Sequence, residues 1–472
     1  MEDSMKKIIT AILFILVLLT VSGCGIFDKD KDKIEYTLSE DGTYYVLSYV
    51  GENIEELVIP EYYNGKPVLE IGDFSCCQKR GQTSHNDSKI KSVKIDAKLT
   101  KIGDSAFEEC IFLETINIPQ TVTEIGEAAF SKCESLKSIE IPIGVTQISE
   151  SLFFECKELE SISLHNKIVK IDSSAFYGCK LIDELILPEG VEFIGERAFS
   201  MMENLQKIKI SEENKKFVSI DGNLYTKDQK ILIQYAPKNE GESFTIPEGV
   251  ETISDFAFSG SSIIKSISIP NSVSVIHSYA FYKCSALGNI NIPNGVKEIS
   301  LCLFEGCTSL KEIVLHNKIT KIDYGAFIGC TSLEKMEIPE SVTEIGGYAF
   351  SECSNLKEIN LPSGLAKLPY AMFEDCTSLE TVSIPNGIEE IDFDTFLNCT
   401  SLKSVYIPSS VKKINNGAFG VCTSLSDINF GGDMNEWKSV DGIRGFWGNK
   451  KYDWCYGSGN FVVHCSDGDF EK

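Results

Sequence analysis

The chain repeats itself every 23 residues. Eleven cysteines keep this step within two blocks, namely Cys110, Cys133, Cys156 and Cys179, followed by Cys284, Cys307, Cys330, Cys353, Cys376, Cys399 and Cys422. A phenylalanine lies three residues before each of them, and a proline lies nine residues after most of them. A fixed period of this length is the signature of a solenoid. The chain is therefore a stack of similar units that bury their apolar faces against one another.

The unit is A-F-x-x-C-x-x-L-x-x-I-x-I-P-x-x-V-x-x-I. Ile139 and Ile141 alternate with polar residues, which predicts a short strand with its isoleucines turned inward. Pro142 ends this strand because it has no amide hydrogen to donate, and Val145 and Ile148 form a second inward pair. With strands about 4.8 Å apart, about sixteen coils would form a rod or shallow horseshoe roughly 75 Å long.

These units resemble the BspA-type leucine-rich repeats of bacterial surface proteins. The resemblance covers about Ile54 to Phe430 and departs from the pattern at 62–67, 78–89 and 211–243. It implies a leucine-rich-repeat solenoid, rich in β-strand, with right-handed coils of 23 residues in a single elongated or horseshoe body with terminal caps. It also implies a binding or adhesion surface in place of an enzyme.

The first residues have the pattern of a bacterial lipoprotein signal. Lys6 and Lys7 precede the apolar segment 8–21, which is too short for a comfortable membrane span. The sequence V-S-G-C that follows is similar to a lipobox, so Cys24 is the predicted lipidation site. The alternative is a plain signal peptide with a chance cysteine. The alternating charges that follow predict a solvated tether.

These features divide the chain into five parts. We expect a lipoprotein signal peptide at 1–23, the lipidated cysteine and tether at 24–33, a cap hairpin at 34–50, the solenoid at 51–430, and a C-terminal cap at 431–472. A pattern of short strands around Asp221-Gly222 predicts a hairpin insert near 211–243. The C-terminal cap is placed where the period breaks, at Trp437, Trp447, Trp454 and the apolar run 461–463.

Charge and cysteine content limit the partners and the chemistry. A formal net charge of −25 argues against nucleic acid or an anionic membrane surface as the main partner. The repeated cysteines occupy a slot that faces the predicted core, so we expect buried, reduced thiols instead of disulfides. Cys455 and Cys465 lie outside this ladder, and a pair across the cap remains an alternative.

The sequence favours neither catalysis nor a bound metal or cofactor. It contains no G-x-S-x-G, H-E-x-x-H or P-loop motif. His165 and His316 share the sequence L-H-N-K-I but lie six coils apart, which a duplicated block of coils explains better than a common site. His464 beside Cys465 is too small a set for a metal site.

The outward positions of the predicted strands are the candidate ligand surface. They are small, polar and mixed in sign, and we expect them to form a long concave face. Lys207, Lys209 and Tyr406 are the predicted contacts with a protein or glycan ligand on host or neighbouring cells. The lipid anchor would be the only contact with the membrane, and the body would face outward from the bacterial envelope. The alternative function is a structural envelope lipoprotein or assembly scaffold without an external ligand.

Overall fold

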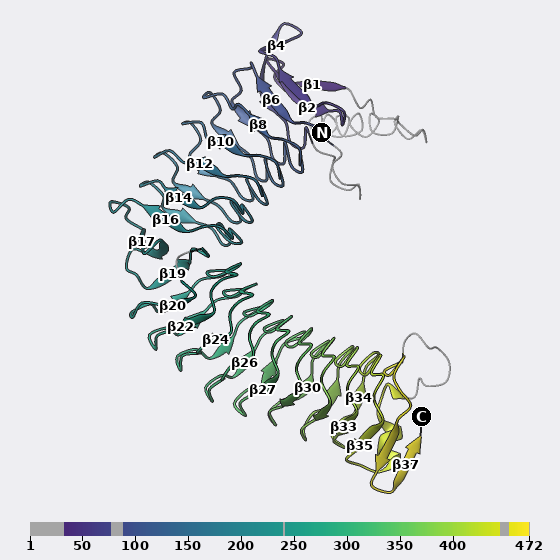
Figure 1. The fold of residues 1–472 in the computed structure, drawn as a ribbon. Helices are drawn as coiled ribbons and strands as arrows, with labels where there is room; N and C mark the ends of the chain where they lie inside the picture. Colours follow the sequence, from purple (N-terminus) through teal and green to yellow (C-terminus); the bar gives the residue numbers. More distant parts are fainter. Residues whose placement is uncertain (1–32, 77–87, 239–240, 444–452, 472) are drawn as a thin grey trace, which may run out of the picture.

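The chain folds into a stack of coils that bends into a horseshoe-shaped arc (Figure 1). The computed structural model describes residues 33–76, 88–238, 241–443 and 453–471. The predicted leucine-rich-repeat solenoid is confirmed, because strands one period apart pair in parallel and in register. Ile139 of one coil, for example, faces Ile162 of the next. The signal peptide, Cys24, most of the tether, the segment 78–87 and Trp447 lie outside the described residues.

The longer strand of each coil contains the L-x-x-I-x-I core and forms the first row of the solenoid. Its inward side chains are buried, as Ile139 and Ile141 show, which confirms the predicted alternation. This row consists of β3 (Glu56–Ile59), β6 (Ser92–Ile95), β8 (Thr115–Ile116), β10 (Ser138–Glu140), β12 (Ser161–Ser163), β14 (Glu184–Leu187), β16 (Lys207–Ile210), β20 (Ser243–Thr245), β22 (Ser266–Ser268), β24 (Asn289–Ile290), β27 (Lys335–Glu337), β29 (Glu358–Asn360), β31 (Thr381–Ser383), β33 (Ser404–Ile407) and β35 (Asp427–Phe430).

A second row of short strands contains the V-x-x-I positions. Val145 and Ile148 are buried there, as predicted. The row consists of β5 (Lys66–Ile71), β7 (Lys101–Ile102), β9 (Glu124–Ile125), β11 (Gln147–Ile148), β13 (Lys170–Ile171), β15 (Phe193–Ile194), β21 (Thr252–Ile253), β23 (Val275–Ile276), β25 (Glu298–Ile299), β26 (Lys321–Ile322), β28 (Glu344–Ile345), β30 (Lys367–Leu368), β32 (Glu390–Ile391) and β34 (Lys413–Ile414).

The turns that carry the Ala-Phe pairs form the third side of each coil. Most turns donate three backbone hydrogen bonds to the next, as Ala128, Phe130 and Lys132 do to the carbonyls of residues 150, 152 and 154 at 2.6–3.1 Å. The turn at 197–201, beside the insert, differs, because its Met201 amide donates to the Ser259 hydroxyl. This ladder continues from coil to coil on both sides of the 211–243 insert, whereas the long strands fall into several separate sheets. Coils that stay closest along the turns and spread at the strands must curve toward the turns.

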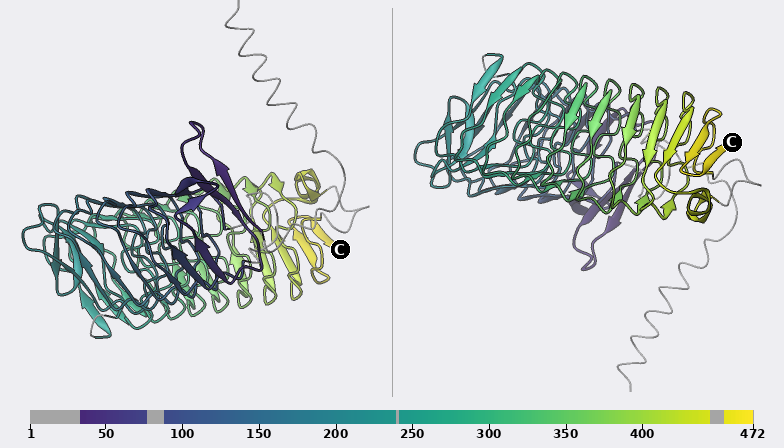
Figure 2. Two further views of the ribbon diagram at one scale, coloured as in Figure 1. Left: turned by 90° about the horizontal axis from the view of Figure 1, so that it is seen from above. Right: turned by 90° about the horizontal axis from the view of Figure 1, so that it is seen from below.

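The polar strand face therefore lies on the convex side of the arc, and the expectation of a concave strand face was wrong. Figure 2 shows the long strands of the C-terminal half along its outer side. The Ala-Phe turns form the concave side, which we call the inner rim. The physical reason is the spacing of the coils: within each half of the solenoid three bonds hold most pairs of neighbouring turns, while the strand row loses its pairing at intervals, for example between β12 and β14.

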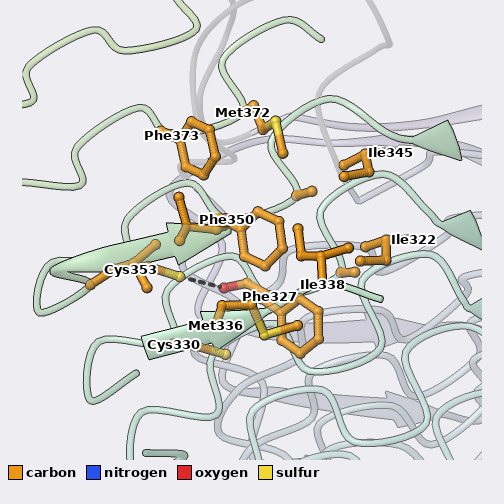
Figure 3. Close-up of a cluster of buried hydrophobic side chains, with 14 of the residues drawn as sticks. Ile322, Phe327, Cys330, Met336, Ile338, Ile345, Phe350, Cys353, Met372 and Phe373 are labelled. Carbon is orange, nitrogen blue, oxygen red and sulfur yellow. Dashed lines mark hydrogen bonds between the residues drawn. The ribbon is translucent and has the colours of Figure 1, made fainter. Parts of the chain in front are cut away.

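Stacked phenylalanines and cysteines fill the core (Figure 3). Neighbouring rings of the ladder lie 5.0–6.1 Å apart, and Phe327 stacks on Phe350 at 5.4 Å. Each cysteine of the ladder is buried, and its thiol donates a hydrogen bond to a backbone carbonyl of the preceding coil. Cys353 Sγ lies 3.2 Å from Phe327 O (Figure 3). The prediction of a core-facing cysteine slot is thus confirmed.

The segment near 211–243 divides the core in two. It contains β17 (Phe217–Ile220), β18 (Asn223–Thr226) and β19 (Ile231–Gln234), which pair antiparallel in that order, and β19 then pairs in parallel with β21. One cluster of buried residues lies mainly before this insert, and a second begins within it, with Tyr225, Leu232 and Tyr235, and continues after it. Tyr235 fills the phenylalanine slot of the second cluster and stacks on Phe258 at 4.9 Å.

The ends of the solenoid are covered by elements that break the period. At the N-terminal end, β1 (Ile34–Leu38) and β2 (Tyr45–Val50) form a hairpin, and β4 (Tyr62–Tyr63) pairs with β5. At the other end, α2 (Met434–Ser439), β36 (Val462–Cys465) and β37 (Gly468–Glu471) follow the last coil. The Trp454 ring packs on Phe419 at 5.9 Å and closes the phenylalanine ladder.

Candidate functional site

The residue ahead of each Ala-Phe pair has a left-handed backbone. Its φ is about +50 to +60° in coil after coil, a conformation that costs a residue with a side chain about 1–2 kcal/mol. In several coils this residue is small, as at Ser105, Ala128 and Gly325. In the middle of the arc it is large: Arg197 (φ 60°) and Phe256 (φ 56°) occupy this position on either side of the insert. The inner rim thus carries bulky side chains where the two halves of the solenoid meet.

These side chains line a hollow of about 510 Å³, which we call the Arg197 hollow. Both halves of the solenoid contribute to it. The hollow is lined by Tyr177, Glu196, Arg197, Asp255, Phe256, Ser278, Tyr279, Tyr282, Leu301 and Glu305. Its volume falls within the range of roughly 300–1,000 Å³ that is typical of small-molecule sites. A smaller hollow of about 230 Å³ adjoins it and shares Glu196, Arg197 and Asp255.

Arg197 joins the aromatic side chains of the two halves. Its guanidinium lies 5.2 Å from the centroid of Tyr177 on one side and 4.9 Å from that of Phe256 on the other. Phe256 stacks on Tyr279 at 4.6 Å, and Tyr282 meets both of these rings edge-on, at 6.2 and 5.8 Å. Cation–π and aromatic contacts of this kind hold the rings in a fixed arrangement before any ligand arrives.

The charges of the hollow are mixed, and Tyr279 is neutral. Glu196, Asp255 and Glu305 supply carboxylates, while Arg197 and the neighbouring Lys283 supply cations, the latter 5.0 Å from the Tyr282 ring. Burial, together with a hydrogen bond to Cys302, raises the pKa of Tyr279 to about 12. Its hydroxyl therefore stays protonated at neutral pH. The hollow offers donors, acceptors and aromatic surface together.

Two other hollows on the solenoid are built differently. One of about 500 Å³ lies on the inner rim of the N-terminal half, where carboxylates line it together with Lys132 and the rings of Phe74 and Phe154, but all of its residues come from one half of the solenoid. Another, of about 460 Å³, lies on the strand face and includes Ser161 and His165, without an aromatic ring other than the imidazole. The Arg197 hollow is therefore our candidate site.

The structure does not bring the three predicted ligand contacts together. Lys207 and Lys209 lie on β16 and both form ion pairs with Glu184, at 2.7 and 2.8 Å. Tyr406 lies on β33, beyond the insert and the strands β20 to β31. All three belong to the convex strand face, and their role in binding stays a prediction. Cys24 lies outside the described residues.

Three histidines have structural partners. His165 Nε2 lies 2.9 Å from Pro142 O, and His316 Nε2 lies 2.9 Å from Pro293 O, so the two make the same contact with the preceding coil. His464 lies between Asp427 and Asp469, at 3.1 and 2.9 Å. No group of three or more His, Cys, Asp or Glu placed to hold a metal ion occurs among the residues that the structure describes.

The described cysteines are free thiols, Cys455 and Cys465 included. Burial raises the pKa of Cys353 to about 12, with comparable shifts along the ladder. Thiols held in this way are poor nucleophiles. Within the described ranges, we find no helix that is long and apolar enough to cross a membrane.

Sequence reasoning missed the inner rim because it looked for aromatic residues on the strands. The signal was present beside the Ala-Phe pairs, where Phe256, Tyr279, Tyr282, Tyr324 and Tyr348 recur. What the repeat alone did not reveal is that these positions share one surface. It also did not reveal that the insert brings Arg197 against Phe256.

Comparison with known proteins agrees with this architecture. The sequence pattern of the family described as "BspA type Leucine rich repeat region (6 copies)" matches residues 100–231, 235–346 and 320–440. A search of curated protein sequences finds no match.

Among solved structures, the pneumococcal vaccine antigen PcpA is 19% identical in sequence to this protein. The match covers 93% of this chain and 98% of the PcpA chain, and its TM-score of 0.53 indicates a shared fold. A leucine rich cell surface protein of Faecalibacterium prausnitzii is 26% identical. The match covers 89% of this chain and 99% of that protein, with a TM-score of 0.44. A leucine-rich repeat protein of Bacteroides ovatus is also 26% identical. The match covers 85% of this chain and 94% of that protein, with a TM-score of 0.42. Because the family pattern matches most of its length, the chain belongs to the BspA-type leucine-rich repeat family.

Proposed function

We propose that this protein is a lipid-anchored surface protein of the bacterial envelope that binds a protein or glycan ligand. The observation that carries the proposal is the Arg197 hollow, in which rings and charged groups from both halves of the solenoid converge. Aromatic and arginine side chains in a preorganised pocket are the features that dominate binding surfaces. The F. prausnitzii protein described as a cell surface protein supports the proposed location.

Binding should be tested with the full chain purified in detergent, on arrays of matrix proteins and glycans. We expect saturable binding that Arg197→Ala weakens at least about tenfold, since loss of a central contact costs about 2 kcal/mol or more. A variant carrying Lys207→Ala, Lys209→Ala and Tyr406→Ala tests the convex strand face in the same assay. Sensitivity of this second variant alone would move the ligand site to the strand face.

The alternative is an envelope scaffold without an external ligand. It predicts no binding above that of an unrelated acidic protein, and it predicts that Arg197→Ala changes nothing but stability. That outcome would remove the binding function from the proposal.

Anchoring at Cys24 has its own test. We expect cells fed a clickable fatty acid to label the wild-type chain and to leave a Cys24→Ser variant unlabelled and released from the membrane fraction. Two acyl chains on one cysteine are enough for stable anchoring. Membrane retention of an unlabelled Cys24→Ser variant would contradict lipid anchoring.

A further inference from the structure

The inner rim continues as an aromatic track beyond the Arg197 hollow. Tyr324, Tyr348 and Tyr370 follow in successive coils, and their rings meet at 5.3 and 5.0 Å. Tyr324 and Tyr370 are exposed, and the hydroxyls of Tyr348 and Tyr370 are 3.0 Å apart. Cys302 joins the hollow to the track, because its amide donates to Tyr324 O at 2.9 Å. The hollow and the track are thus parts of one surface with a repeat of one coil.

The charges of this surface disfavour a strongly charged ligand. An anion in the hollow would meet the carboxylates of Glu196, Asp255 and Glu305. A cation would meet Arg197, which already occupies the space between the Tyr177 and Phe256 rings. Like charges at a contact are a common means of excluding the wrong ligand.

An uncharged carbohydrate matches what remains. Its hydroxyls both donate and accept hydrogen bonds, so they can pair with the carboxylates, the guanidinium and the hydroxyls of Ser278 and Tyr282. The C–H faces of a pyranose ring are apolar and pack on aromatic rings, which expose an apolar face beside a polar tip in tyrosine. A chain of sugars also has a repeat of its own, as the track has.

We infer that the inner rim binds an uncharged glycan, with one end of the chain in the Arg197 hollow and the following sugars along Tyr324, Tyr348 and Tyr370. This inference rests on the proposed binding function and names its ligand class. It requires that affinity increase with chain length and that the two parts of the surface be separable by mutation.

Calorimetry on the full chain in detergent would test this with uncharged oligosaccharides from disaccharides to octasaccharides. Matched series with carboxylates or free amines provide the charged comparison. We expect Tyr282→Ala to weaken binding of every length at least about tenfold. Tyr348→Ala should weaken only the longer chains, and Ile186→Ala, at an exposed position of β14 on the convex face, should change nothing. Glu305→Gln, which keeps the shape of the side chain, should also weaken binding and guards against misfolding of the alanine variant.

The outcomes separate the inference from the proposed function. Hollow-dependent binding of a protein without binding of any glycan would overturn the inference and leave the binding function intact. A preference for the charged series, or glycan binding unaffected by both Tyr282→Ala and Glu305→Gln, would also overturn it. Absence of every hollow-dependent ligand would overturn both.

Discussion

The left-handed residue ahead of each Ala-Phe pair is a point of stored strain that the fold tolerates in coil after coil. Glycine adopts this conformation without steric cost, whereas alanine pays for its Cβ. Ala128 has a φ of 52°, and Gly325 occupies the equivalent position with a φ of 63°. At some positions of this row, replacing the residue by glycine should therefore stabilise the folded protein.

We predict that Ala128→Gly stabilises the protein by about 0.5–1 kcal/mol, the relief of strain exceeding the entropy that glycine loses on folding. Thermal unfolding of the two proteins would measure it. The matched control is Ala129→Gly at the next residue, where the alanine is buried and its φ is not positive. That change should destabilise by about 1 kcal/mol. Destabilisation by Ala128→Gly would contradict the role given to the backbone.

Cysteine suits its slot in the repeat because its side chain is small and its thiol makes one weak hydrogen bond. Cys353 is fully buried and its thiol reaches Phe327 O. We predict that Cys353→Ala destabilises the protein by about 1–2 kcal/mol, because it leaves a small void and removes the thiol's hydrogen bond to Phe327 O, which then keeps only the bond from Cys330 N. In the folded wild type, Cys353 should not react with a thiol reagent, while the partly exposed Cys465 reacts first. Peptide mapping after timed labelling distinguishes the two, and early labelling of Cys353 would refute the prediction.

The strands β35, β36 and β37 are joined by a carboxylate–histidine–carboxylate bridge. Hydrogen bonds to Asp427 and Asp469 raise the pKa of His464, and hydrogen bonds from Ser426 and His464 lower the pKa of Asp427. The stabilisation by charged His464 is complete below its usual pKa near 6.5 and is lost as the pH rises through the raised value. The part that depends on Asp427 is lost only when the pH falls through its lowered pKa.

We therefore predict that the melting temperature of wild type exceeds that of His464→Gln at mildly acidic pH and that the difference disappears in alkaline solution. Thermal unfolding across this pH range would test it, with His165→Gln as the control because that histidine contacts a carbonyl. A difference that grows with pH would contradict the bridge.

At the scale of the strand and turn, the repeat was enough to predict the coil but not its curvature. The alternation around Ile139 and the proline after it fix where a strand lies and which way it faces. The side toward which the stack bends depends on which ladder keeps its hydrogen bonds from coil to coil within each half, and that is the ladder of the Ala-Phe turns. The candidate site escaped prediction for a related reason. Arg197 and Phe256 meet only because the insert folds out of their way on the inner rim.

For the molecule as a whole, the divided core predicts two cooperative units. At the inner rim of the junction, Met201 N donates to the Ser259 hydroxyl at 3.4 Å, and the insert residue Tyr235 donates to Ala257 O. In a repeat array, such an interface can uncouple the halves, because stability is a sum of local terms.

We predict that Tyr235→Ala speeds opening only in the C-terminal half, where Tyr235 belongs to the buried cluster. Leu185→Ala should do the same only in the N-terminal half. Hydrogen exchange resolved by peptide, at rising denaturant, would measure both. Equal effects on the two halves would show that the solenoid unfolds as one unit.

The ladder along the inner rim, with its interruption at the insert, also has a mechanical consequence. If a ligand bound along Tyr324, Tyr348 and Tyr370 pulls on the C-terminal half while the membrane holds the N-terminal end, the horseshoe straightens and its concave edge lengthens. The hydrogen bonds between successive turns then carry the load in series. The weakest link is the junction at the insert, where the regular three bonds are replaced. Under tension this junction would open first and lengthen the molecule while the coils on either side stay folded. The insert would therefore limit the force that reaches the remaining coils.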